Sequence, residues 1–187
     1  MQEYTVTRYS FPELGESARE TAIKRVQERL WEWLDSDLIK EYLSDDLLEQ
    51  LGSDAEELEI QFSLSYCQGD GVALYGRLYK CKSLAWPEGV AYLELTKNSW
   101  GAHYSHYNSF NVTAYDSEGY ELGLDISVIE KQLRDLCREL ARKGYSYIEA
   151  ETSRESAIDY LENNTGDEFT IHGDYSPITV TDISEVA

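Results

Sequence analysis

A hairpin in the first half of the chain constrains the fold more than any other feature. From Leu58 to Tyr66, apolar and polar residues alternate, which is the pattern of a strand with one buried and one solvated face. Residues 67–71, Cys-Gln-Gly-Asp-Gly, then place two glycines around an aspartate and predict a tight turn. Residues 72–80 return as the partner strand. The sequence therefore predicts an antiparallel sheet.

Other segments add strands and helices to this hairpin. Strand character recurs over residues 4–9, 91–96 and 104–115, and more weakly over 168–180. Helical spacing of apolar residues predicts helices over residues 17–34, 38–51, 127–144 and 153–163. We therefore expect a single α+β domain over residues 1–187, with a loosely attached tail at 174–187. Its antiparallel sheet of about four to five strands is packed by N-terminal and C-terminal helices.

Local signals set the expected helix ends and inward faces. Ser17 with Glu20, and Ser127 with Glu130, match the capping box that begins a helix. Glycine commonly follows the last turn of a helix, so stops are expected at Gly52 and near Gly144. In the second helix the residues expected to face the core are Leu38, Tyr42, Leu47 and Leu51.

The chain carries an excess of acid that folding does not require. It has 36 Asp and Glu against 16 Lys and Arg, a formal net charge of −20, and self-repulsion at this charge opposes a compact state. No Lys or Arg occurs between Glu41 and Gly76, and Arg154 is the sole base after Lys143. The charge is thus segregated along the chain, which favours acidic faces over evenly spread charge.

Clustering decides whether this charge resembles nucleic acid. A folded chain of this size exposes on the order of 9,000 Å², so a partner footprint of about 800 Å² would hold roughly two evenly spread net charges. Ten base pairs of duplex DNA carry about twenty. The alternatives are therefore an acidic solvated surface without a target and acids gathered as a ligand for a basic surface.

Several classes of partner and cofactor are disfavoured. Direct binding to nucleic acid or to an anionic membrane surface needs clustered Lys and Arg. The N-terminus lacks the basic and apolar regions of a signal peptide, and no long apolar run occurs. Cys67, Cys81 and Cys137 form no CxxC pair, so neither a disulfide framework nor a thiolate zinc site is indicated. We expect a cytoplasmic protein without cofactor or metal; its oligomeric state is left open.

The residues most similar to an active site surround the hairpin turn. They are Asp70, His103 and His106, which Gln68, Tyr104 and Cys67 could join. Residues three apart on a strand point to opposite faces, so the two histidines would share a metal only across a turn or bulge. The chain has no Walker loop, nucleophile elbow or helical HExxH motif. Histidines hydrogen-bonded within a sheet or turn are the simpler interpretation, and we do not expect an enzyme.

The hairpin motif resembles that of a family of small phage and prophage proteins. The matching residues are 66–72, Tyr-Cys-Gln-Gly-Asp-Gly-Val, then 103–106, His-Tyr-Ser-His, and 167–173, Asp-Glu-Phe-Thr-Ile-His-Gly. In this family a similar QGDG hairpin precedes a Tyr/His-rich strand, and some members carry an antitoxin-like label. The resemblance covers about residues 5–173 and implies a phage or mobile-element origin. This chain differs by a longer, more acidic run before the hairpin and by extra residues after Gly173.

Acidity and phage resemblance together favour an inhibitor of a host nucleic-acid-binding defence complex, of anti-CRISPR or anti-restriction type. The expected partner is a basic host protein or nucleoprotein complex whose nucleic-acid site the acids occupy. The expected contacts are Asp45, Asp46, Glu49, Asp54, Glu56, Glu57, Glu59, Glu149, Glu151, Glu155, Asp159 and Glu162. One alternative is an antitoxin-like partner of a basic toxin. Another is a small enzyme or metal-binding protein that uses Asp70, His103 and His106.

Overall fold

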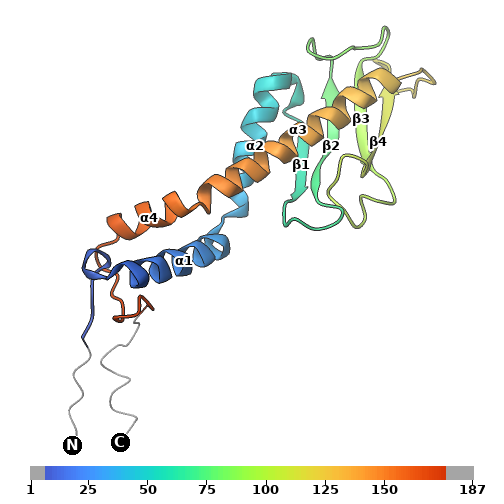
Figure 1. Ribbon diagram of the computed structural model, residues 1–187. Coiled ribbons are helices and arrows are strands. Elements are labelled where there is room, and N and C mark those ends of the chain that lie inside the picture. Colours follow the sequence, from blue (N-terminus) through green and yellow to red (C-terminus); the bar gives the residue numbers. More distant parts are fainter. Residues whose placement is uncertain (1–6, 176–187) are drawn as a thin grey trace, which may run out of the picture. The chain divides into compact units, whose positions relative to one another are not determined.

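The computed structural model describes residues 7–175 as an α+β fold, the class expected from the sequence (Figure 1). Four strands form one antiparallel sheet in chain order: β1 (Leu58–Ser63), β2 (Gly71–Tyr79), β3 (Tyr92–Lys97) and β4 (Phe110–Tyr115). The helices before the sheet are η1 (Phe11–Glu13), α1 (Glu16–Trp33), α2 (Ser36–Leu51) and η2 (Ser53–Ala55). Those after it are α3 (Ser127–Glu151) and α4 (Arg154–Asn163).

The chain divides into two compact units, and each is described by itself. Unit 1 comprises residues 1–34 and 148–187, and unit 2 comprises residues 35–147. The single domain expected from the sequence stays a prediction. Residues 4–6 of the first expected strand, and most of the expected tail, lie outside the described residues. Within residues 7–175, no helix combines the length and apolar character needed to cross a membrane.

Unit 1 is built on the packing of α1 against α4. Ala22 and Val26 of α1 are buried in one cluster with Ala157 and Leu161 of α4 and with Phe169. Tyr9 and Phe169 exchange two backbone hydrogen bonds, of 3.0 and 2.9 Å. A single antiparallel bridge therefore represents the first expected strand among the described residues.

The start of α1 differs from the expectation. The helix begins at Glu16 with Gly15 as N-cap, and the Ser17–Glu20 capping box was wrong. The reciprocal pattern occurs instead one turn earlier, on η1, where the Ser10 backbone N–H donates to Glu13 at 2.8 Å. Both pairs have the capping-box spacing, so the spacing alone did not distinguish them.

Unit 2 contains the sheet, α2, η2 and most of α3, and α3 covers one face of the sheet (Figure 1). Strand register places Ile60 opposite Leu74, and Leu78 opposite Leu93, so these buried side chains share one face. The guanidinium of Arg134, on α3, lies 5.0 Å from the ring centroid of Phe110 on β4. Apolar alternation in β1, the continuously buried first half of β2 and the apolar stripe of α3 together produce this core.

Two expectations about α2 had different outcomes. Gly52 ends the helix with φ of 77°, as expected. The inward face was partly wrong, because Leu38 and Tyr42 are exposed, whereas Ile39 and Leu43 are buried with Leu47 and Leu51. Apolar residues at both 38 and 39 made the sequence ambiguous. Contact with the rest of the unit selects the stripe at every fourth residue from Ile39.

The third long helix continues past Gly144, so the expected stop was wrong. Gly144 is buried inside α3, and a Cβ at this position would lie 2.5 Å from Cδ1 of Leu64 and 3.5 Å from Cδ2 of Leu43. The glycine therefore serves close approach of the helix to its neighbours. A glycine near the end of an apolar stripe can either end the helix or allow close packing against a neighbour, and the sequence alone does not distinguish these two roles.

The fourth strand is shorter than expected. It begins at Phe110, and residues 98–109 form a loop without regular secondary structure. In this loop the backbone N–H groups of His103 and Tyr104 both donate to the carbonyl of Trp100, at 2.9 and 2.8 Å. This turn takes His103 and Tyr104 out of the sheet.

Candidate functional site

The acids expected to contact a partner form two tracts, residues 45–59 and 149–162. Those of the first tract lie on consecutive elements of unit 2. Asp45, Asp46 and Glu49 lie on α2, Asp54 on η2, Glu56 and Glu57 in the link after it, and Glu59 on β1. All except Asp46 and Asp54 are exposed. Asp46 forms an ion pair with Lys143 of α3 and accepts from Gln50 at 2.8 Å. Asp46 therefore joins two helices, whereas its neighbours Asp45 and Glu49 are exposed.

The net charge of unit 2 is confined to the segment that carries these acids. The unit contains 20 Asp and Glu against 10 Lys and Arg. Residues 35–76 hold 11 of these acids and one base, whereas residues 77–147 hold nine of each. The entire net charge of −10 thus belongs to α2, η2, β1 and the hairpin turn. We call residues 35–76 the acidic segment.

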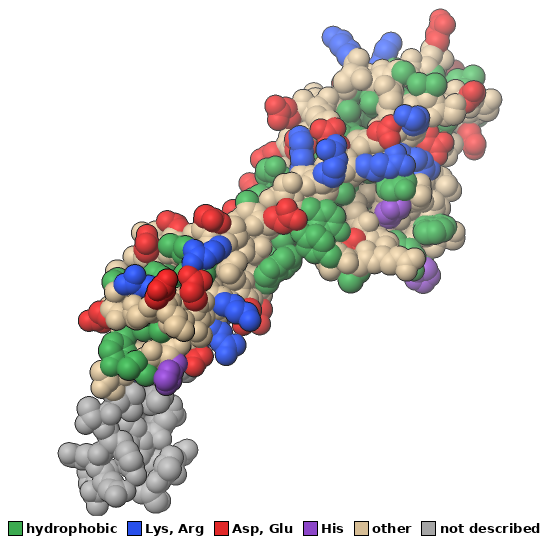
Figure 2. Space-filling view, viewed as in Figure 1, with side chains coloured by type: hydrophobic (Ala, Val, Ile, Leu, Met, Phe, Trp, Pro, Cys, Tyr) green, Lys and Arg blue, Asp and Glu red, His purple; other side chains and the backbone are tan. Residues whose placement is uncertain are grey.

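Bases compensate acids in the rest of unit 2. Over residues 77–147, Arg77 pairs with Glu94, Arg134 with Glu130, and Lys131 and Arg138 with Asp135. Figure 2 shows basic side chains in a row over α3, with acids beside them. Within the described part of the chain, no ion pair involves Asp45, Glu49, Asp54, Glu56 or Glu59.

The second acidic tract lies in unit 1. Glu149 and Glu151 belong to the last turn of α3, and Glu155, Asp159 and Glu162 belong to α4. All five are exposed. Unit 1 has 16 Asp and Glu against 6 Lys and Arg, so it also carries a net charge of −10. The structure therefore places one tract in each unit.

Helix ends show that some of these acids oppose stability. In the described chain, none of the four α-helices has a base in its last turn. Exposed carboxylates of Glu32, Glu49, Glu151 and Glu162 lie there instead. The C-terminal end of a helix carries partial negative charge, so these positions are unfavourable for an acid. The helix ends therefore give no reason for an acid at these four positions.

Asp70 holds the hairpin turn together. Its carboxylate accepts from the Ser63 hydroxyl at 2.6 Å, from the Ser65 and Cys67 backbone N–H groups at 2.7 Å each, and from the Tyr145 hydroxyl at 3.4 Å. Desolvation raises the pKa of Asp70, but these hydrogen bonds outweigh it, so the pKa lies below its ordinary value. With its acceptor capacity used inside the turn, Asp70 has a structural role.

The two histidines lie in the loop 98–109 and have different surroundings. His103 is exposed, and its ring lies edge-on to Tyr104 at 6.3 Å between centroids. His106 is half-buried; its Nδ1 accepts from the Asn108 N–H at 3.3 Å. Desolvation, Arg138 and Arg134 lower the pKa of His106, so the ring is neutral at physiological pH and carries its proton on Nε2.

The structure does not join these residues into one reactive group. Among the described residues, Asp70 accepts hydrogen bonds from Ser63, Ser65, Cys67 and Tyr145, and none from a histidine. Among residues 7–175, no group of three or more His, Cys, Asp or Glu side chains is placed to hold a metal ion. The catalytic or metal-binding alternative thus gains no support from the geometry.

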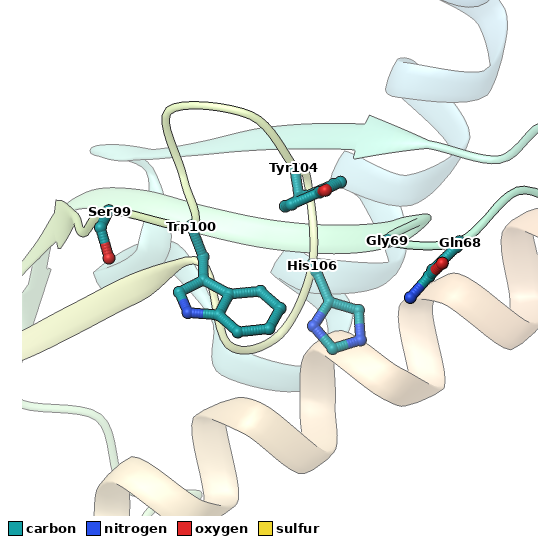
Figure 3. Close-up of a pocket in the computed structure, with 6 residues that line it drawn as sticks. All are labelled: Gln68, Gly69, Ser99, Trp100, Tyr104 and His106. Atoms are coloured by element: carbon teal, nitrogen blue, oxygen red, sulfur yellow. The ribbon is translucent and has the colours of Figure 1, made fainter.

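A pocket of about 450 Å³ lies between the hairpin turn and the loop 98–109 (Figure 3). Gln68 and His106, which the sequence marked as candidates, line it. Tyr104, which the sequence joined to the same group, lines it as well, together with Ser99 and Trp100, which sequence reasoning missed. These two residues belong to the Asn-Ser-Trp-Gly run at 98–101, which falls between two expected strands.

No family model, curated protein or solved structure matches the chain. The resemblance to phage and prophage proteins therefore stays a prediction.

Proposed function

We propose that the chain is an acidic binding protein that occupies a basic nucleic-acid-binding surface of another protein. The observation that carries the proposal is the confinement of the net charge of unit 2 to residues 35–76. A soluble protein without a target needs only mixed charges of both signs on its surface, as residues 77–147 have. A block of uncompensated exposed carboxylates fits a basic partner instead.

The amount of charge suits a short nucleic-acid site. A net charge of −10 equals that of about five base pairs of duplex DNA. The carboxylates at helix C-termini add to the argument, because they remain where they cost stability. Residues that oppose folding and stay exposed are typical of a binding surface.

The sequence resemblance narrows the kind of target. Phage and prophage proteins meet host complexes that bind nucleic acid, and a CRISPR effector or a restriction enzyme presents the basic channel required. We propose that the acidic protein acts in the host cytoplasm as an inhibitor of such a complex. Its carboxylates replace phosphates in the channel, so inhibition is by competition with nucleic acid.

Displacement of a labelled duplex tests this proposal. The duplex is bound to a purified CRISPR effector with its guide, or to a restriction endonuclease, and its fluorescence anisotropy is followed as the acidic protein is added. We expect release of the duplex from at least one such complex and at least a tenfold weaker effect between 50 and 200 mM salt. A basic protein without a nucleic-acid site is the control, and its affinity for the acidic protein should be far lower.

Two results would contradict the proposal. The first is failure to displace nucleic acid from every complex of a panel that covers both kinds of target. The second is inhibition that is unchanged by salt, because an interaction carried by exposed carboxylates is screened by added ions.

A further inference from the structure

The pocket between the hairpin turn and the loop 98–109 is built by contacts that do not involve the acids of the two tracts. A Cβ at Gly69 would lie 2.2 Å from Cδ1 of Tyr104, so the glycine lets the hairpin meet the tyrosine ring. Asn98 accepts from the N–H groups of Trp100 and Gly101 at 2.9 and 3.1 Å. The loop conformation is therefore fixed on the side where Trp100 lines the pocket.

The other side of the loop is fixed as well. The buried hydroxyl of Ser109 accepts from the His106 backbone N–H at 3.1 Å. Arg134 of α3 donates to the carbonyl of Tyr107 at 2.5 Å and to that of Phe110 at 3.2 Å. This loop is positioned by side chains from the sheet end and from α3.

The lining combines aromatic faces with uncharged polar groups. Trp100 is 56% exposed and Tyr104 is 43% exposed, with ring centroids 6.0 Å apart and planes inclined by 48°. Figure 3 shows Trp100, Tyr104 and His106 around a common space, with Gln68 extending toward His106. Aromatic walls with a few polar groups are typical of sites for small molecules. Two inclined rings offer one face for stacking and one for an edge contact.

The lining of the pocket offers no ionic partner to a ligand. None of the described residues that line it carries a formal charge. A charged ligand would lose hydration there without gaining an ion pair from these residues. The lining therefore favours an uncharged ligand.

The polar groups define the ligand further. With Nδ1 of His106 engaged by Asn108, Nε2–H is a donor. The Gln68 amide provides a donor and an acceptor together, which matches an amide-like edge. We propose that this pocket binds an uncharged planar heterocycle that bears an amide-like donor–acceptor edge, as nucleobases and pyridine carboxamides do. This site is distinct from the acidic tracts and does not depend on their function.

Titration with three pyridine compounds that share one ring but differ in net charge tests the proposal. The probes are nicotinamide, its anionic analogue nicotinate and its cationic analogue 1-methylnicotinamide, with cyclohexanecarboxamide as a non-planar neutral control. Side-chain signals of the four tryptophans and of His106 are followed by NMR. We expect nicotinamide to shift the Trp100 and His106 signals at millimolar concentration, as a fragment of this size does. The other three probes should bind at least about fivefold more weakly.

Variants locate the site. Trp100→Ala and Gln68→Leu should each weaken nicotinamide binding at least about fivefold, whereas Tyr120→Ala, a change at a 66% exposed tyrosine outside the pocket, should leave it unchanged. Gln68 is an exposed side chain in a turn, so its variant keeps the test valid if Trp100→Ala does not fold. Equal binding of a charged or non-planar probe, or shifts confined to other tryptophans, would overturn the proposal.

Discussion

At the scale of single residues, Gly76 is the position in the hairpin where a side chain is tolerated least. It lies in β2 with φ of 112°, and a Cβ there would stand 2.2 Å from the carbonyl oxygen of Glu57. Gly76→Ala should lower the free energy of unfolding by about 3 kcal/mol, because backbone strain and a backbone clash add. Gly123→Ala, where nothing lies within 4 Å, is the control and should change it by less than about 0.5 kcal/mol. Equal effects in urea unfolding would contradict this reading.

Asp70 gives a prediction that depends on pH. Its pKa is lowered in the folded state, so its hydrogen bonds contribute stability above the unfolded pKa of about 3.9, and this contribution is lost as pH falls through the folded pKa. Asp70→Asn should therefore cost about 1–2 kcal/mol at pH 7. The difference from the wild type should shrink below about pH 4. A difference in unfolding free energy that stays constant down to the acid transition would show that the carboxylate charge is not what holds the turn.

The residues of the pocket show where sequence reasoning stopped. Gln68 and His106 were found because the glycine-flanked turn and the paired histidines are local patterns. Tyr104 was found with them because it lies between the two histidines. Trp100 was missed because the loop conformation depends on Arg134, which follows more than 25 residues later. Asp70 was placed correctly in the turn, but its partner Tyr145 is supplied by α3. Contacts between distant segments had no signature in one sequence.

At the scale of secondary-structure elements, the ends of α2 make a matched pair. Asp37 lies in the first turn and Glu49 in the last, and both are exposed acids. Glu49→Lys should raise the unfolding free energy by about 0.5 kcal/mol, whereas Asp37→Lys should lower it, because the two helix ends carry opposite partial charges. Both changes alter the net charge equally, so general repulsion cancels in the comparison. Thermal unfolding that moves in the same direction for both variants would rule out this account of the helix ends.

Elements with strong periodicity were predicted, and their ends and faces were not. The strict alternation from Leu58 and the glycine turn gave β1, β2 and their antiparallel pairing. The inward face of α2 and the continuation of α3 through Gly144 depend on which neighbours pack there. Helical spacing locates the buried face of a helix to within one residue, and packing against neighbouring elements selects between the adjacent faces.

At the scale of the whole molecule, salt should have opposite effects on folding and on binding. Repulsion among 36 acids against 16 bases opposes the compact state, and added ions screen it. The midpoint of thermal unfolding should therefore rise between low and moderate NaCl, while affinity for a basic partner falls over the same range. A midpoint that falls with NaCl would show that attractive ion pairs, and not repulsion, dominate the charge balance.

The most direct test of the central claim compares two triple variants of unit 2 with the same change in charge. The first variant changes exposed acids of the acidic segment: Asp45→Lys, Glu49→Lys and Glu56→Lys. The second changes exposed acids of residues 77–147, which have no net charge: Glu88→Lys, Glu118→Lys and Glu121→Lys. The measured quantity is the concentration of the acidic protein that displaces half of a labelled duplex from the CRISPR effector or restriction enzyme that it inhibits. We predict an increase of at least about tenfold for the first variant and less than about threefold for the second. Equal increases would show that total charge, and not the acidic segment, carries the function.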